Sequence, residues 1–142
     1  MRPSTPRFNK PAAVAVYRDA IFVADSGNNR IRKIAPNGTV STVAGNGEAG
    51  FEDGVCTAAK FNFPGAIVID GDNLLVSDVG NNRIRKITPD GHVITVAGSE
   101  SGEFNAPVGI AVDNTGKIFV ADSLNNRIRV VQPHPSSSTA SE

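Results

Sequence analysis

The residues of this 142-residue chain that could do chemistry gather in one polar stretch that occurs three times. Each copy holds an aspartate, two consecutive asparagines and an arginine that comes five positions after the aspartate. A carboxylate and a guanidinium on either side of a tight loop can form an ion pair that fixes local geometry. Binding sites usually differ between copies and these residues do not, so we predict a structural role between strands and between repeats. The pairs are Asp25 and Arg30, Asp78 and Arg83, and Asp122 and Arg127.

A second arginine follows two positions after the first in every copy, at Arg32, Arg85 and Arg129. We expect these side chains to be solvated at the edge of a sheet. A phosphate-binding stripe is the alternative.

Short apolar runs bounded by turn residues surround each polar stretch. In the first repeat the strands are expected at residues 13–16, 21–24, 30–34 and 39–43, and the second repeat has the same order. Such units leave no room for a crossover helix, so we expect antiparallel sheets. Repeated four-stranded units are typical of propeller blades. The first strand of each unit is nearly all apolar, and we expect it to be buried on both faces.

The repeats also divide the chain. We predict a disordered lead-in at residues 1–7, blades at 8–45, 61–98 and 104–133, and a disordered Ser-rich tail at 134–142. The tail is not expected to supply a fourth strand to the third blade, which leaves about eleven strands. Residues 46–60 are an insert between the first two blades, and its last part is expected to form a single helical turn.

The third repeat carries the fullest form of a known pattern. Pro107–Asp113 reads Pro-x-Gly-Ile-Ala-Val-Asp, and Ile118–Arg129 contains Ile-Phe-Val-Ala-Asp and Asn-Asn-Arg-Ile-Arg. Residues 8–133 therefore resemble the NHL repeat. The resemblance implies an all-β fold, a β-propeller of NHL-type four-stranded blades, usually about six to a ring. About three blades are then half a ring or a fragment of one, whose open faces favour self-association that completes the ring.

The overall composition excludes some classes of partner and site. The formal net charge is zero, with 14 basic and 14 acidic residues, which removes the bulk electrostatic argument for nucleic acid or an anionic membrane. Cys56 is the single cysteine, so an intrachain disulfide and a cysteine-based zinc site are excluded. The sequence shows neither a signal peptide nor a stretch of the roughly 20 apolar residues that span a bilayer. We expect a soluble domain, cytoplasmic by default.

Catalysis is the first alternative function. The resemblance extends to propeller lyases and lactone hydrolases with a metal ion in the central channel, where Asn9, Asn62 and Asn105 could coordinate calcium. His92 and His134 lack metal-ligand spacing, and no Ser-His-Asp set is indicated. We predict no catalytic residue, no metal and no cofactor.

The function that we predict is a non-enzymatic scaffold that presents one loop-rich face to a protein partner. The polar loops share this face with the connections between blades, where acidic residues give a mixed charge. An RNA-binding module is the second alternative, which the mixed charge disfavours. The predicted partner-binding residues are Glu48, Phe51, Glu52, Asp53, Glu100 and Glu103.

Overall fold

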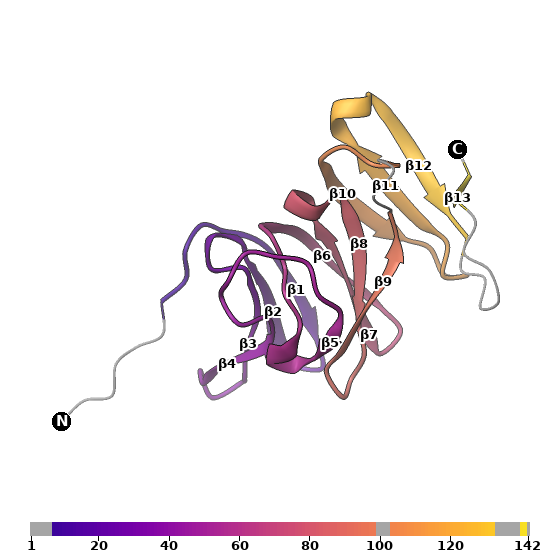
Figure 1. Cartoon of the computed structure of the whole chain (residues 1–142). Coiled ribbons are helices and arrows are strands. Elements are labelled where there is room, and N and C mark those ends of the chain that lie inside the picture. Colours follow the sequence, from indigo (N-terminus) through magenta and orange to yellow (C-terminus); the bar gives the residue numbers. More distant parts are fainter. Residues whose placement is uncertain (1–6, 99–102, 133–139, 142) are drawn as a thin grey trace.

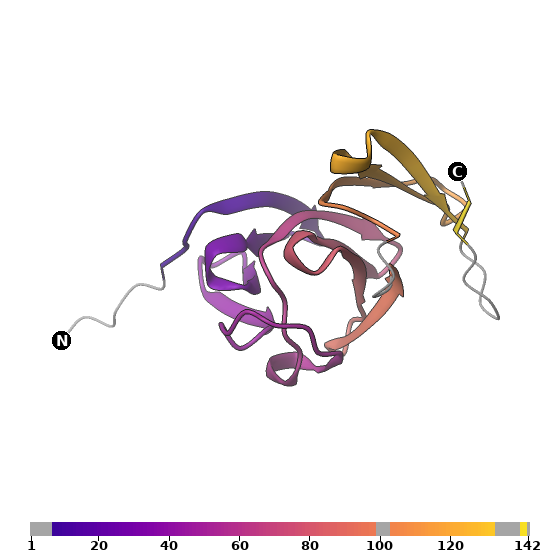
Figure 2. The ribbon, with the colours of Figure 1, turned by 45° about the horizontal axis from the view of Figure 1, so that its top comes forward.

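Three antiparallel sheets follow one another along the chain in the computed structural model, which describes residues 7–98, 103–132 and 140–141 (Figure 1). Each sheet is one blade, and its strands are joined in up-and-down order. The first strands of the three blades are neighbours, because β6 lies between β1 and β10. The blades therefore stand side by side in chain order, with blade 3 at one end (Figure 2). This arrangement is that of consecutive blades of a β-propeller.

Blades 1 and 3 contain four strands each. Their loops between the second and third strands are short 3-10 turns, Ser26–Asn28 and Ser123–Asn125. In blade 1 the strands are β1 (Pro11–Tyr17), β2 (Ala20–Asp25), β3 (Arg30–Ile34) and β4 (Val40–Ala44). In blade 3 they are β10 (Pro107–Val112), β11 (Ile118–Asp122), β12 (Arg127–Val131) and β13 (Ala140–Ser141).

Blade 2 has a fifth strand, which comes from the insert. Strand β5 (Gly54–Val55) pairs antiparallel with β9 at the outer edge, and the 3-10 turn Cys56–Ala58 follows it. The predicted helical turn in the insert is therefore confirmed. The other strands are β6 (Pro64–Asp70), β7 (Asn73–Asp78), β8 (Arg83–Ile87) and β9 (His92–Ala97), with the 3-10 turn Val79–Asn81 after β7.

Turn residues set the register of the strands. Gly38 and Gly91 adopt φ of +90° and +89° in the hairpins between the third and fourth strands of blades 1 and 2. Only glycine reaches this region without strain, so the Asn-Gly and Asp-Gly pairs place these turns as the sequence predicts.

Two apolar clusters lie between the blades. The first includes Ile31 of blade 1 with Phe61 and Val76 of blade 2, and the second joins Ile84 of blade 2 to Val120 of blade 3. Alternate residues along each strand face opposite neighbours, so blade 2 contributes one face to each cluster. The core of the molecule is thus divided between two blade-to-blade junctions.

The expected number of strands and the expected burial of the first strand are wrong. The described part of the chain contains 13 strands, because the insert supplies β5 and the tail supplies β13, which pairs with β12. Strand β1 is not buried on both faces, since Val14 and Val16 are 63% and 68% exposed. Of the two segments predicted to be disordered, residues 1–6, 134–139 and 142 lie outside the described residues. Within the described residues, no helix is long and apolar enough to cross a membrane.

Candidate functional site

A buried aspartate ends the second strand of each blade and organises the loop that follows it. In blade 2 the side chain of Asp78 is fully buried. Its Oδ1 accepts a hydrogen bond from the backbone N–H of Asn62 at 2.8 Å, and its Oδ2 accepts from Asn81 Nδ2 at 2.7 Å and from Arg85 at 2.6 Å. The carboxylate therefore joins the segment that enters the blade, its own loop and the next strand.

The same geometry recurs in the other two blades. Asp25 accepts hydrogen bonds from Asn9 N–H at 2.8 Å, Asn28 Nδ2 at 2.9 Å and Arg32 at 3.2 Å. The equivalent bonds to Asp122 come from Asn105 N–H, Asn125 Nδ2 and Arg127 Nε, at 2.6, 2.9 and 3.1 Å. Each of the three aspartates therefore accepts hydrogen bonds from the segment that enters its blade, from its own loop and from an arginine of the next strand.

The arginines do not pair as the sequence suggests. In blades 1 and 2 the ion pair to aspartate comes from Arg32 and Arg85, and only blade 3 uses the first arginine, Arg127. The second arginines are also not solvated, because the side chain of Arg85 is fully buried and that of Arg32 is 11% exposed. Arg30 instead donates to the carbonyl of Asn46 at 3.0 Å. Both arginines lie on one face of their strand, so either one can reach the aspartate, the first directly opposite and the second on the diagonal.

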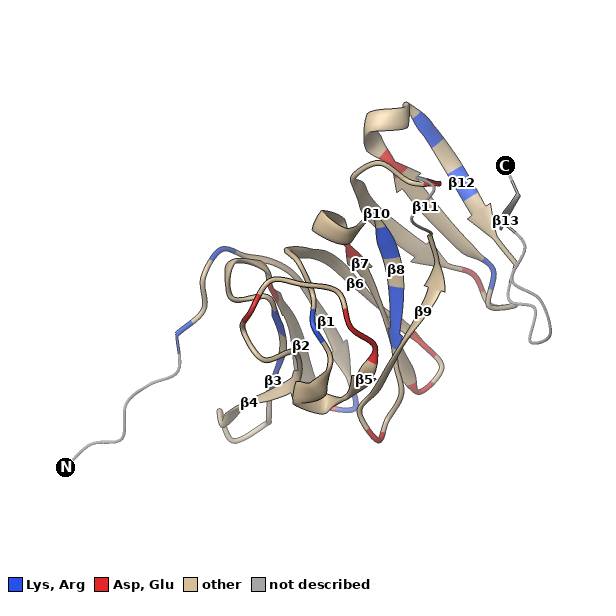
Figure 3. Ribbon diagram, viewed as in Figure 1, with Lys and Arg blue, Asp and Glu red and all other residues tan. Residues whose placement is uncertain are grey.

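Arg85 is the most heavily engaged of these arginines. Its guanidinium carbon lies 4.8 Å from the ring centroid of Phe51 and 4.8 Å from that of Phe61. It also donates to the carboxylate of Asp53 at 2.9 Å and to the carbonyl of Glu52 at 2.6 Å. A planar guanidinium can stack and donate in its plane at once, which a lysine cannot do. Arg85 therefore holds the insert against blade 2. Figure 3 shows basic segments along β8 and acidic segments in the connection that leads to β5.

The second asparagine of each loop connects one blade to the next. Asn29 and Asn82 adopt left-handed backbone conformations with φ of 53° and 56°. Their side-chain oxygens accept hydrogen bonds at 2.9 Å from the backbone N–H of Phe63 and of Ala106, which lead into the following blades. The sequence analysis missed this role, although two consecutive asparagines in all three copies were its signal.

The insert is held in place along its length. Gly50 N–H donates to the carbonyl of Phe61 at 3.1 Å, and Lys60 N–H to that of Glu52 at 3.0 Å. Asp53 also accepts from the backbone N–H and the hydroxyl of Thr95, at 3.2 and 2.9 Å. The insert therefore runs from blade 1 to the outer edge of blade 2 as an ordered segment.

The predicted partner-binding residues lie in different surroundings. Glu48 and Glu52 are exposed, and the carboxylate of Glu48 lies 3.2 Å from Lys60 Nζ. Phe51 is 40% exposed while its other face covers Arg83, whose guanidinium carbon is 4.0 Å from the ring centroid. Glu103 contributes its carbonyl, which accepts from Arg127 and Arg129 at 3.1 and 3.0 Å. Glu100 lies outside the described residues.

Burial affects two of the aspartates differently. At Asp78, burial raises the pKa of the carboxyl above its ordinary value, and this outweighs the hydrogen bonds that favour the charged form. At Asp122, the raising effect of burial is outweighed by hydrogen bonds from Asn105, Asn125 and Arg127, so the pKa of that carboxyl is lowered. The same motif thus holds its carboxylate in two electrostatic environments.

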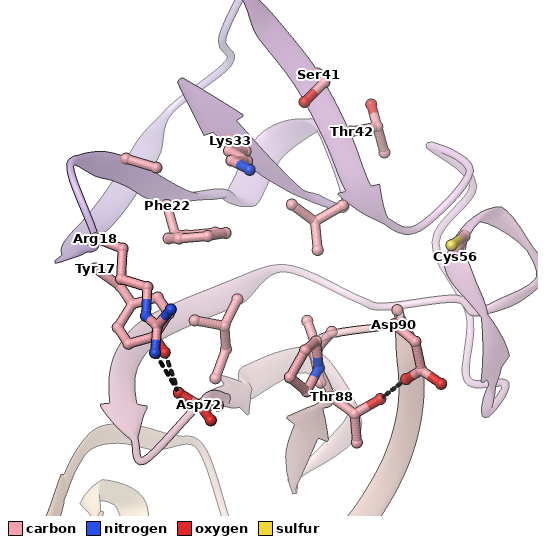
Figure 4. Close-up of a pocket in the computed structure, with 16 residues that line it drawn as sticks. Tyr17, Arg18, Phe22, Lys33, Ser41, Thr42, Cys56, Asp72, Thr88 and Asp90 are labelled. Carbon is pink, nitrogen blue, oxygen red and sulfur yellow. Dashed lines mark hydrogen bonds and ion pairs between the residues drawn. The ribbon is translucent and has the colours of Figure 1, made fainter. Parts of the chain in front are cut away.

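A cavity of about 580 Å³ lies between blades 1 and 2, at the end of the blades opposite the aspartate loops. Arg18 lies 3.6 Å from Asp72 at one side of it, and Thr88 donates to Asp90 near the other (Figure 4). Cys56 also lines it, and its N–H donates to the carbonyl of Gly91 at 2.9 Å, next to His92 in the chain. These groups bond to one another in pairs and do not form a nucleophile–base set.

The described residues hold no cluster of three or more His, Cys, Asp or Glu side chains that could bind a metal ion. Two of the asparagines considered as calcium ligands, Asn9 and Asn62, pack tightly against the loop that follows the second strand of the same blade. A Cβ atom added to Gly27 or Gly80 of that loop would lie only 2.6 Å from the Cγ atom of Asn9 or Asn62, respectively. Arg85 is also too deeply buried to contact a nucleic-acid phosphate.

Comparison with known proteins places this geometry in a family. Residues 104–131 match the model of the NHL repeat. The human NHL repeat-containing protein 2 is 33% identical over 97 residues, which is 68% of this chain and 13% of that protein. The chain thus spans a small part of this relative.

Solved structures share the fold. A chain of the nidogen/laminin complex has a TM-score of 0.68 at 15% identity, over 92% of this chain and 46% of that one. Virginiamycin B lyase from Staphylococcus aureus has a TM-score of 0.68 at 16% identity, over 92% of this chain and 40% of that one. At such identities the likeness shows the fold alone. Together, the three sheets, the repeated loops and the matched repeat show that the chain belongs to the NHL-repeat β-propeller family.

Proposed function

We propose that this NHL-repeat module is a non-enzymatic scaffold that binds a protein partner through the end of the blades that carries the insert. The supporting observation is that the insert is ordered on a rigid frame, with Asp53 and the Glu52 carbonyl fixed by the buried Arg85. A loop that is already ordered loses little conformational entropy on binding.

The exposed groups define the chemistry of the partner. Glu48 and Glu52 are exposed in the same segment as the partly exposed Phe51. Asp53 is occupied by Arg85 and Thr95, so it supports this surface. A peptide with a basic residue next to an apolar one fits these groups best, through charge and ring contact.

The test is a selection of random displayed peptides on the 142-residue chain, followed by calorimetry of the enriched peptides. We expect basic, apolar peptides whose dissociation constants rise about tenfold or more in the double variant Glu48→Gln/Glu52→Gln. Enrichment of neutral peptides, or unchanged affinity in this variant, would contradict the proposal.

The matched control is Asp19→Asn, which removes one carboxylate from an exposed turn at the opposite end of blade 1. Its affinity should equal that of the wild type. Deletion of residues 48–53 is not a suitable test. The deletion would take away two of the groups that satisfy the buried Arg85 guanidinium.

A further inference from the structure

The side of blade 3 that faces away from blade 2 is open. Ile31 of blade 1 and Ile84 of blade 2 are fully buried against the blade that follows each of them. The equivalent residue of blade 3, Ile128, is 60% exposed. Leu124 beside it in the loop is 66% exposed. Blade 3 therefore exposes the apolar face that, in blades 1 and 2, packs against the following blade.

The opposite end of the row has the complementary open face. Leu74 of blade 2 and Ile118 of blade 3 are 6% and 5% exposed, because each packs on the preceding blade. The equivalent residue of blade 1, Ile21, is 37% exposed. Val14 is 63% exposed where its counterpart Ile67 is 5% exposed. Blade 1 thus lacks a preceding neighbour in the described structure.

Polar groups at the two open ends match as well. In both internal junctions the second asparagine accepts from the N–H of a residue with left-handed backbone, Phe63 (φ 56°) or Ala106 (φ 55°). The corresponding residues at the open ends are Asn126 (φ 57°) and Lys10 (φ 52°), which already have these conformations. In the described part of the chain, no donor reaches the side-chain oxygen of Asn126.

A contact from the serine that follows the aspartate is made at the first junction only, because Val79 takes the place of Ser26 in blade 2. Ser26 of blade 1 is fully buried and donates its hydroxyl to the carbonyl of Pro64 in blade 2. The equivalent Ser123 is exposed, and the carbonyl equivalent to that of Pro64 belongs to Pro11. Each open face therefore carries one half of the asparagine bond that the chain contains twice, and one half of this serine bond, which it contains once.

We propose that a second copy of this chain occupies these faces, with blade 3 of each copy packed on blade 1 of the other. Ile128 then covers Val14 and Phe8 of the second copy, and Asn126 accepts from the N–H of its Lys10. The contact is head-to-tail, so two identical junctions close the pair into one ring of blades.

Sedimentation equilibrium of the 142-residue chain tests this proposal. We expect a dimer at concentrations of about 100 μM, and monomers for Ile128→Asp and for Val14→Asp, each with a dissociation constant at least about 100-fold higher. Both positions are exposed in the single chain, so far-UV circular dichroism should show each variant folded. The control Ile94→Asp, at an exposed position of β9, should remain a dimer.

Three results would overturn the proposal. A monomeric wild-type chain would exclude a second copy and leave a blade of another sequence as the occupant. A dimer that dissociates in Ile128→Asp but persists in Val14→Asp would mean that blade 3 pairs with itself. A growing series of open oligomers would overturn the closed ring.

Discussion

At the scale of residues, the fold depends on buried charge. Asp78 and Arg85 are both fully buried and 2.6 Å apart. Moving two charges out of water is costly, and the cost is recovered only where every remaining donor and acceptor is well placed. Here hydrogen bonds from Asn62 and Asn81 satisfy Asp78, while the Asp53 carboxylate and two aromatic rings contact Arg85. Arg85 Nε is buried without a hydrogen-bond partner in the described structure. The main role of the pair is therefore to fix positions: it sets where blade 2 contacts the insert and the loop after β7.

Replacing Arg85 by Met should lower the free energy of unfolding by about 3–5 kcal/mol, because Asp78 keeps a buried charge without its cation. Urea denaturation followed by circular dichroism measures this change. The double variant Arg85→Met/Asp78→Asn should recover part of the loss, because it leaves no unpaired charge. The control Arg18→Ala breaks an exposed pair with Asp72 and should change stability by less than about 1 kcal/mol. Equal losses in the single and double variants would contradict this view.

The stability of the fold should depend on pH through the carboxyl group of Asp90. Hydrogen bonds from Thr88 and His92 lower the pKa of its carboxyl from 3.8 to about 2. A lowered pKa in the folded state stabilises the fold above the ordinary pKa, and this contribution is lost as the pH falls toward the folded value. Between pH 3.8 and about 2, Asp90→Asn should therefore lose less stability than the wild type. Urea titrations at several pH values check the sign, and a steeper loss in the variant would refute it.

At the scale of elements, the insert changes from a loop to part of a sheet. Strand β5 has only two residues, yet it pairs with β9 and brings Asp53 to Arg85 and Thr95. A strand edge that is covered in this way is protected from pairing with other chains. The insert thus stabilises the outer edge of blade 2 and connects it to blade 1.

Asp53→Asn should loosen this edge locally, because the ion pair to Arg85 is lost. Hydrogen exchange should become faster at the amides of β5 and of the first half of β9, while those of β3 in blade 1 stay unchanged. Glu48→Gln is the matched control, since its carboxylate contacts only the partly exposed Lys60 among the described side chains. Faster exchange over all three blades would mean that Asp53 acts on global stability instead.

The strands of the blades follow from the sequence because apolar runs, Asn-Gly and Asp-Gly turns and a fixed repeat all indicate the same structure. Strand β5 does not follow, because Gly54–Val55 is too short to show a period of two. The pairing of the arginines does not follow either. Arg30 and Arg32 share one face, and only the packing of Phe8 and of the insert decides which guanidinium turns inward. The role of Asn29 is a hydrogen bond to the next blade, and a local sequence pattern carries no information about a contact so far along the chain.

At the scale of the molecule, the two clusters between blades make each blade depend on its neighbours. The outer faces of blades 1 and 3 remain uncovered, as the exposures of Val14 and Ile128 show. Stability in such a repeat array is a sum of blade and junction terms, and each new junction adds to it.

If two copies close a ring, the thermal midpoint of unfolding should rise with protein concentration, because association stabilises only the folded state. Differential scanning calorimetry over a wide concentration range measures this effect in the wild type. The midpoint of Ile128→Asp should be lower and independent of concentration. A wild-type midpoint that does not move with concentration would argue against association.

The asparagine and serine bonds between blades have a consequence for how such chains diversify. Both end on backbone groups of the following blade, the N–H of Phe63 or Ala106 and the carbonyl of Pro64 or Val108. Backbone groups are the same whatever the side chain, so a junction places few demands on the identity of its neighbour. A gene segment encoding one blade can then be duplicated or exchanged between positions without new polar contacts having to evolve, while the connections, such as the insert here, are free to acquire new roles.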